Sequence, residues 1–216
     1  MNPDSTFSYT KDPKYLTPFL IFMLLILIGA NFILALNDLS TFALLDQGFT
    51  EAQAKASDSL QNSLSVVYFL LFLVTGITFL RWIYRANLNS KGFGAQNMRF
   101  TPGWSIAYYF IPIASLVMPY RSLKEISKIS HNPKVWKSQK TGLILPLWWM
   151  LWLASCVLGQ FTLMLSRNAE TIESLKGATA FSMFTNIFDI PLCLVAIILV
   201  RKISKRQNLL VTPSQL

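Results

Sequence analysis

Charged residues are scarce in this chain of 216 residues: Asp, Glu, Lys and Arg together make up 13%, against about 25% in a typical soluble domain. Apolar and aromatic residues make up 53%, and the mean hydropathy is +0.44. Such a chain is too apolar to be water-soluble or intrinsically disordered. The composition also excludes a disulfide scaffold and a collagen-like fibre. It therefore indicates an integral membrane protein.

Histidine and cysteine are also rare, with one His and two Cys. His131 alone cannot supply both axial ligands of a b-type haem, nor a site built from several histidines. Cys156 and Cys193 both fall inside apolar segments, where they are interpreted as small hydrophobic residues and not as a disulfide or metal pair. We therefore expect neither a metal nor another cofactor.

Sequence signatures of enzymes are missing. The chain has no glycine-rich phosphate loop with its lysine, and no GxSxG, HExxH or CxxC motif. A serine-type intramembrane site would need a histidine at membrane depth, whereas His131 belongs to a basic loop. An aspartyl intramembrane site would need two membrane aspartates, and only Asp189 lies inside an apolar run. We therefore expect a protein that is not an enzyme.

Four apolar runs are long enough to cross a hydrocarbon core of about 30 Å, which takes about 20 helical residues. They cover residues 16–36, 64–83, 143–165 and 180–200. All four are apolar on every side, as expected of helices surrounded by lipid and other helices. The first two are separated by a predicted outside loop over residues 37–63. Its alanine-rich middle, TEAQAKASDSLQ, has helix-forming composition, with Thr50 as the expected N-cap.

A fifth apolar run, WSIAYYFIPIASLVMP over residues 104–119, is different. A straight helix of this length would measure only about 24 Å, which is short of a full crossing. Pro112 lies at its midpoint, and Pro102 and Pro119 flank it. A proline inside a helix removes a backbone hydrogen bond and clashes with the preceding turn. The run is interpreted as a re-entrant or interfacial element, or as a short kinked span.

The positions of the basic residues decide between these alternatives. If four helices cross and both termini are cytoplasmic, 16 of the 19 Lys and Arg residues lie inside, and Lys55, Arg167 and Lys176 lie outside. If residues 104–119 also crossed, the split would be 8 inside and 11 outside. The positive-inside rule therefore favours four spans with cytoplasmic termini. The net charge of +9 is thus explained by topology, and we expect no nucleic-acid partner.

A short basic segment, YRSLKEISKIS, follows the fifth run over residues 120–130. Its apolar residues recur every three positions, and basic residues lie between them: Leu123, Ile126 and Ile129, and Arg121, Lys124 and Lys128. This spacing predicts a basic amphipathic helix in the headgroup plane on the cytoplasmic side. The three basic residues are candidates for anionic lipid headgroups, and they also serve to set the topology.

An ordered series of motifs runs from Arg81 to Ile126. It comprises Arg85, Asn87 and Asn89, then Thr101-Pro102-Gly103-Trp104, then Phe110-Ile111-Pro112-Ile113, then Pro119-Tyr120, and finally Glu125. With this series the chain resembles the bacterial membrane family known as domain of unknown function 4328. The resemblance implies a bacterial protein with several spans, and it implies no activity. Arg85 and the two asparagines either hold a phosphate headgroup, fold over the broken element, or form a polar loop that caps helix ends.

Asp189 is the sharpest candidate for chemistry, because it lies near the middle of the fourth apolar run, three residues after Asn186. A charged carboxylate at the bilayer centre costs about 2.5–3.5 kcal/mol, so we expect Asp189 to be protonated. It is interpreted either as a proton or cation site, or as an aspartate hydrogen-bonded inside the bundle beside Pro191. Asn31 and Gln160, in the first and third runs, are its candidate partners.

Together these features predict an all-α integral membrane protein of the bacterial inner membrane, formed as a single domain. It has four transmembrane helices, one short proline-broken element and two cytoplasmic termini. Two classes of function stay open. The first is a binding, scaffold or sensor component that uses the basic cytoplasmic face, with a second copy or another membrane protein as partner. The second is a small oligomeric transporter or channel in which Asp189 carries a proton or cation.

Overall fold

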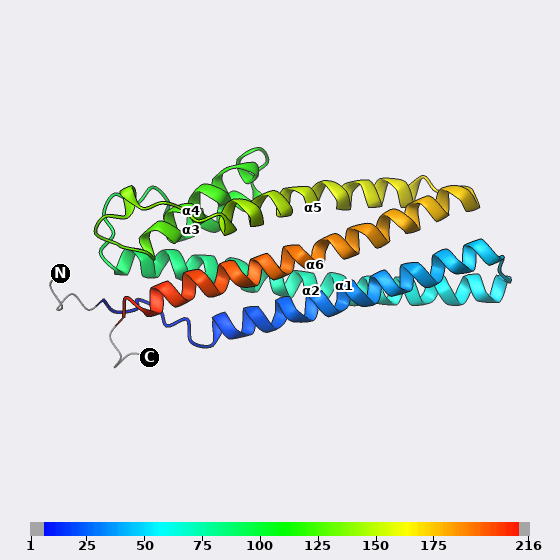
Figure 1. The fold of residues 1–216 in the computed structure, drawn as a ribbon, viewed down its shortest axis with the longest axis horizontal. Helices are drawn as coiled ribbons and strands as arrows, with labels where there is room; N and C mark the ends of the chain where they lie inside the picture. Colours follow the sequence, from blue (N-terminus) through cyan, green and yellow to red (C-terminus); the bar gives the residue numbers. More distant parts are fainter. Residues whose placement is uncertain (1–6, 212–216) are drawn as a thin grey trace. The chain divides into compact units, whose positions relative to one another are not determined.

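The computed structural model describes residues 7–211, and within them the chain is helical, with one isolated β-bridge between Phe7 and Val211 (Figure 1). The four long helices are α1 (Leu16–Gln47), α2 (Glu51–Gly92), α5 (Ile144–Arg167) and α6 (Ile172–Asn208). The short elements between α2 and α5 are α3 (Pro102–Ala107), η1 (Tyr108–Phe110), η2 (Ala114–Leu116), α4 (Met118–Ile129) and η3 (Trp136–Ser138), where η denotes a 3₁₀ turn.

All four long helices are long and apolar enough to cross a membrane, which confirms the four predicted membrane helices. At about 1.5 Å per residue, the 24 residues of α5 measure about 36 Å and the 42 residues of α2 about 63 Å. Each therefore exceeds a hydrocarbon core of about 30 Å. The helices are longer than the apolar runs of the sequence. Backbone hydrogen bonding continues into polar residues, where hydropathy no longer indicates a helix.

Both helices extend into the predicted outside segment 37–63, because α1 continues to Gln47 and α2 begins at Glu51. That this segment lies outside the membrane stays a prediction. The predicted N-cap is confirmed. The backbone N–H of Gln53 donates to Thr50 Oγ1 at 3.3 Å, and the N–H of Thr50 donates to Gln53 Oε1 at 2.8 Å. This reciprocal capping box satisfies two backbone donors that have no partner inside the helix. It fixes the first residue of α2.

The chain forms two compact units. Unit 1 consists of residues 1–22, 75–149 and 195–216, and unit 2 consists of residues 23–74 and 150–194. Unit 2 holds only parts of the four long helices, whereas unit 1 also holds α3, α4 and the three 3₁₀ turns.

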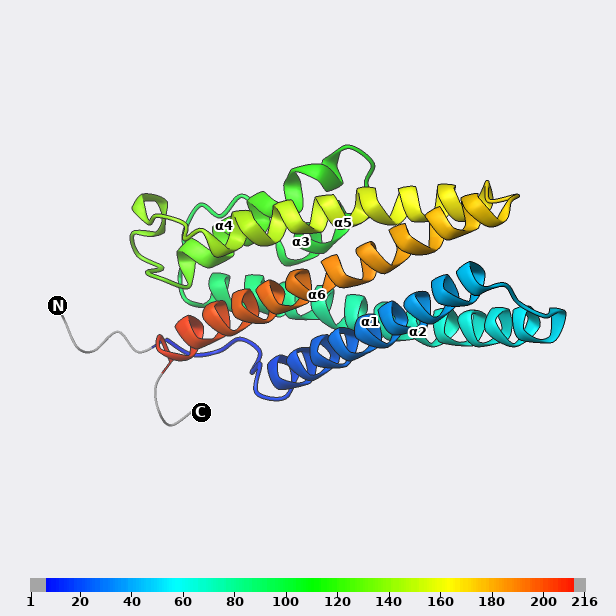
Figure 2. The same ribbon diagram turned by 45° about the vertical axis from the view of Figure 1, so that its right-hand side comes forward.

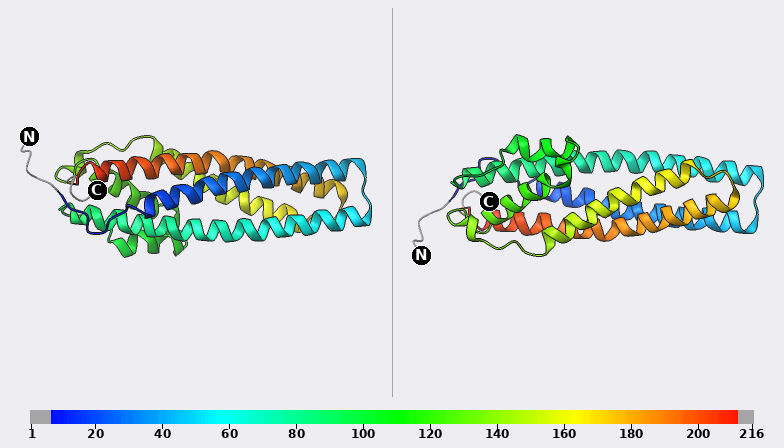
Figure 3. Two further views of the ribbon diagram at one scale, coloured as in Figure 1. Left: turned by 90° about the horizontal axis from the view of Figure 1, so that it is seen from below. Right: turned by 90° about the horizontal axis from the view of Figure 1, so that it is seen from above.

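Unit 2 is built from two antiparallel helix pairs. Figure 2 shows the α1–α2 pair from blue to cyan, and Figure 3 shows the α5–α6 pair from yellow to orange. The hydroxyls of Thr41 and Ser57 lie 3.2 Å apart between α1 and α2. Those of Thr162 and Thr185 lie 3.0 Å apart between α5 and α6. Small hydroxyl residues thus join the helices of each pair, as is common where helices pack in lipid.

Unit 1 has an apolar core drawn from α2, α4, α5 and α6. Side chains with at most 3% exposure include Trp82, Ile83, Leu123, Ile126, Ile129, Leu145, Val200 and Ile203. The helix predicted over residues 120–130 is present as α4. Its apolar face, however, packs inside unit 1, where Leu123, Ile126 and Ile129 are fully buried. Protein therefore covers the apolar face of this helix, and its position in the headgroup plane stays a prediction.

The apolar run at 104–119 does not form one helix. Ile113 has φ 67° and ψ −51°, and the N–H of Ala114 donates to the carbonyl of Pro112 at 2.7 Å. This is a γ-turn of the strained type, in a region of φ that β-branched residues seldom adopt. The chain therefore turns between η1 and η2, and α3 and α4 contact one another (Figure 1). That this α3–α4 hairpin is re-entrant relative to a bilayer stays a prediction.

Candidate functional site

The polar residues of the sequence motifs act on the backbone of the loop that leads into α3. Glu125 of α4 accepts the N–H of Arg99 at Oε2, 2.9 Å, and the N–H of Phe100 at Oε1, 3.1 Å. Asn87 of α2 donates from Nδ2 to the carbonyl of Phe100 at 3.2 Å. Asn87 is fully buried and Glu125 is 6% exposed. Charge-assisted bonds of this kind are about twice as strong as neutral ones. This loop clamp therefore holds α3 between α2 and α4.

The start of α3 follows from the same loop. Thr101 caps the helix by accepting the N–H of Trp104 at 3.4 Å, and Pro102 occupies the first turn, where it loses no hydrogen bond. The ring of Tyr108 lies 5.2 Å from that of Trp104 and 5.9 Å edge-on from that of Phe100. The motif residues at this end are thus explained by local folding and ring packing.

The turn of the α3–α4 hairpin carries an exposed apolar surface. Phe110 is 73% exposed, Ile113 83% and Leu116 55%. Pro119 is buried at the start of α4, and the ring of Tyr120 next to it lies 6.3 Å from that of Trp149. Exposed apolar groups of this size mark a surface that meets lipid or another protein.

The N-terminal segment is fixed to α2 through side-chain amides. Asn89 accepts the N–H of Lys11 and donates to its carbonyl, both at 2.9 Å, and it is itself fully buried. Arg85 donates from Nη1 to the carbonyl of Asp12 at 3.1 Å. Tyr9 donates to the side chain of Asn208; burial, and next the charge of Asp12, raise the pKa of Tyr9 to about 12, so it stays a donor at neutral pH. These contacts hold the N-terminal strap, residues 7–15, in place.

Sequence reasoning missed the residues of α6 that complete unit 1. Gln207 is 2% exposed and donates to the carbonyl of Ala86 at 3.0 Å. Trp82 donates from Nε1 to Ser204 at 3.2 Å. A signal was present, because Ser204 and Gln207 interrupt a run of basic residues at positions three apart, on one side of a helix.

The basic residues of α4 lie away from its buried face. Arg121 is exposed, and Lys124 and Lys128 are partly exposed. The Lys124 ammonium lies 5.8 Å from the centre of the Tyr120 ring, and Lys128 donates to the carbonyl of Lys137 at 3.3 Å. Three cations therefore remain at the surface of unit 1, as their spacing predicted.

A buried aspartate that sequence reasoning placed in a loop lies inside α1. Asp38 is 3% exposed, and its Oδ2 accepts hydrogen bonds from Ser182 at 2.9 Å and from Asn186 at 2.8 Å. The amide of Asn186, one helical turn from Asp189, therefore serves Asp38. The hydropathy run ends before Asp38, which is why the sequence alone did not mark it as a bundle residue.

Asp189 lies among polar groups from three other helices of unit 2. Ser155 of α5 hydrogen-bonds to its carboxyl group. The hydroxyl of Tyr68 in α2 lies near Asp189 and hydrogen-bonds to the side chain of Asn31 in α1. Asn31 is 1% exposed and donates to the carbonyl of Leu27 at 2.9 Å. The Oδ1 atoms of Asn31 and Asp189 are buried without a hydrogen bond of good geometry.

The other proposed partner, Gln160, is exposed on α5. The two cysteines are free thiols, with Cys156 exposed and Cys193 buried. Across residues 7–211 no three His, Cys, Asp or Glu side chains gather into a group that could hold a metal ion. The polar sites of this chain are thus hydrogen-bonded pairs and small clusters.

The chain is a membrane protein of the all-helical class. Its four long helices are apolar enough to cross a membrane, and its composition is too apolar for a water-soluble protein. Within that class, the chain belongs to the family described as "Domain of unknown function (DUF4328)", whose sequence profile matches residues 46–205. Searches of curated proteins and of solved structures found no match.

Replacing Glu125 with Gln tests the loop clamp. The substitution replaces one carboxylate oxygen with an NH₂ group, which cannot accept the backbone N–H of Arg99 or Phe100. We therefore expect a loss of about 1–3 kcal/mol of local stability. In hydrogen exchange of the detergent-purified protein, the amides of residues 99 and 100 should exchange at least tenfold faster. Glu170→Gln is the matched control, since Glu170 is exposed. Equal exchange in both variants would contradict the clamp.

Proposed function

We propose that this chain is a multi-pass protein of the bacterial inner membrane with both termini in the cytoplasm. In this arrangement the α3–α4 hairpin enters the cytoplasmic leaflet and returns to the same side. The protein serves as a non-enzymatic binding or scaffold component, or as a sensor, and its basic cytoplasmic face holds a membrane protein partner or a second copy.

The observation that carries this proposal is the α3–α4 hairpin, which is hydrogen-bonded at one end and has an exposed apolar turn at the other. Glu125 and Asn87 fix one end of the hairpin to the rest of unit 1, while Phe110, Ile113 and Leu116 are exposed at the other. An exposed apolar turn is unfavourable in water and favourable in lipid. The distribution of basic residues supports the same orientation, with 16 of 19 on the cytoplasmic side.

The orientation is tested by cysteine labelling at the two ends of α5, in a background without Cys156 and Cys193. In intact cells, an impermeant maleimide should label Asn168→Cys and leave Ser138→Cys unlabelled until the membrane is permeabilised. Both positions are exposed, so burial does not mask the reagent. Labelling of Ser138→Cys in intact cells would show that the hairpin crosses the membrane and would overturn the proposal.

The scaffold role is tested by photo-cross-linking in native membranes. A photoreactive residue in place of Arg121 should give a discrete protein adduct, and the same residue in place of Lys55 should give none. Lys124→Gln with Lys128→Gln should reduce the adduct severalfold, because the partner is attracted by these charges. An adduct of two copies would identify the partner as the chain itself. Lipid adducts alone, or equal adducts at both positions, would contradict a protein-binding face.

The Asp189 cluster favours a second function, a small oligomeric transporter or channel. Two buried acceptors, the Oδ1 atoms of Asn31 and Asp189, lack a hydrogen bond of good geometry. Such atoms need a proton or a cation to satisfy them. Tyr68 and Ser155 supply hydroxyls to the same cluster from two further helices. A proton on Asp189, or a bound monovalent cation, is therefore the species that this site would carry.

Flux through the Asp189 cluster is measured in proteoliposomes under a proton or monovalent cation gradient. A transporter should exceed empty liposomes, and Asp189→Asn should lower its flux at least tenfold, because the amide cannot release a proton. Asp58→Asn, at an exposed position of α2, should leave the flux unchanged. The same rate in native protein, Asp189→Asn and empty liposomes would exclude this function.

A further inference from the structure

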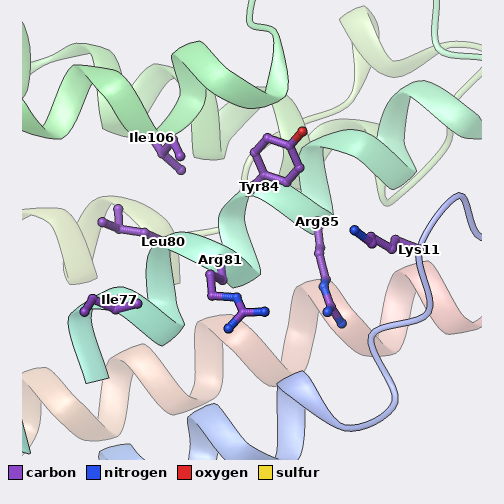
Figure 4. A pocket seen from close by; sticks show the side chains of 7 residues that line it. All are labelled: Lys11, Ile77, Leu80, Arg81, Tyr84, Arg85 and Ile106. Carbon is purple, nitrogen blue, oxygen red and sulfur yellow. The ribbon is translucent and has the colours of Figure 1, made fainter. Parts of the chain in front are cut away.

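A groove of about 390 Å³ lies on unit 1. Five of its lining residues lie along one face of α2, and α3 and the N-terminal strap supply the other two (Figure 4). The lining residues are Ile77, Leu80, Arg81, Tyr84 and Arg85 of α2, Ile106 of α3 and Lys11 of the strap. The α2 residues lie three, four, seven and eight positions after Ile77, which is why they share a face. The α3–α4 hairpin and the strap thus build this groove against α2.

The groove changes in character along α2. Ile77 and Leu80 lie inside the second apolar run, and Arg85 lies past its end. From Ile77 to Arg85 the helix rises about 12 Å. One end of the groove is therefore apolar, with Ile106 facing α2, and the other end is cationic.

Within residues 7–211, no acidic side chain forms an ion pair with the cationic end of the groove. None of the seven lining residues is acidic, and within residues 7–211 neither Lys11 nor either arginine forms an ion pair. Asp12, the nearest acidic residue in the sequence, uses Oδ1 to accept the N–H of Lys14 at 2.8 Å. Three cations gathered beside an apolar wall favour an anion between them.

Hydrogen bonds fix the backbone of Lys11 and the side chain of Arg85. Lys11 is fixed by the two 2.9 Å bonds between its backbone and the side chain of Asn89. Arg85 is fixed by its bond to the carbonyl of Asp12, which uses one of the five donors of its guanidinium group. The charged end is thus assembled from segments more than 60 residues apart in the sequence, and not from a run of basic residues.

We propose that this groove binds one anionic glycerophospholipid of the cytoplasmic leaflet. Its phosphate lies between Lys11, Arg81 and Arg85, and an acyl chain follows Ile77, Leu80 and Ile106 toward the membrane interior. A free phosphate would leave the apolar half empty, and a zwitterionic lipid would leave excess positive charge. The site rests on the membrane orientation proposed above, and it is separate from the basic face of α4.

The test counts bound lipid by native mass spectrometry on the full-length protein in neutral detergent. Phosphatidylglycerol should be retained at least tenfold more than phosphatidylcholine of the same acyl chains. Arg81→Gln with Arg85→Gln should abolish this preference, because each nearby basic residue adds to the attraction for an anionic lipid. Lys134→Gln with Lys140→Gln removes the same charge from an exposed loop of unit 1 and should leave the preference intact.

Two further arms complete the test. Glycerol phosphate, the headgroup without acyl chains, should be retained at least tenfold less than phosphatidylglycerol. Lys11→Gln should weaken the preference for phosphatidylglycerol severalfold. This variant tests the site even if the double arginine variant does not fold, because Lys11 is exposed and its backbone hydrogen bonds do not involve its side chain. Equal retention of both lipids, equal retention by all variants, or equal binding of glycerol phosphate would overturn the proposal. The cysteine labelling separately reports a failure of the orientation.

Discussion

The structure depends on one constraint: a polar group removed from water has to find a hydrogen-bond partner inside the protein. The long helices satisfy their own backbones, so they continue well past the apolar residues that mark them. Where the backbone is irregular, side chains supply the missing partners. The carboxylate of Glu125 and the amide of Asn89 both do this, each with two bonds to backbone groups. In unit 1, buried amides and carboxylates thus bond to the irregular backbone segments.

This constraint gives the family motif a physical meaning. Asn87, Asn89 and Glu125 each bond to the backbone of a distant segment, and Pro102 and Pro119 each sit in the first turn of a helix. The motif thus specifies how a hairpin and a strap are attached to α2. Several side chains that project from these attached segments are exposed, among them Phe110, Ile113 and Leu116.

Asp38 and Asp189 of unit 2 differ in how fully their carboxyl groups are hydrogen-bonded. Asp38 has two donors on its Oδ2 from Ser182 and Asn186 of α6, and it serves to join two helices. Asp189 leaves one oxygen without a hydrogen bond of good geometry, and so does the amide oxygen of Asn31 in α1. A satisfied carboxyl group stabilises packing, whereas an unsatisfied one marks a place for a proton or an ion. Unit 2 therefore combines a structural polar pair with a polar cluster whose chemistry is incomplete.

The sequence by itself determined the class of protein, the four membrane helices, the N-cap at Thr50 and the amphipathic pattern of α4, because each depends on composition or on spacing along one helix. It did not determine what covers a helix face. Only the tertiary structure decided that the apolar side of α4 packs within unit 1, that Asn186 serves Asp38, that Gln160 is exposed and that Lys11 joins two arginines of α2. Each of these is a contact between segments distant in sequence, and no local periodicity encodes which partner a side chain will meet.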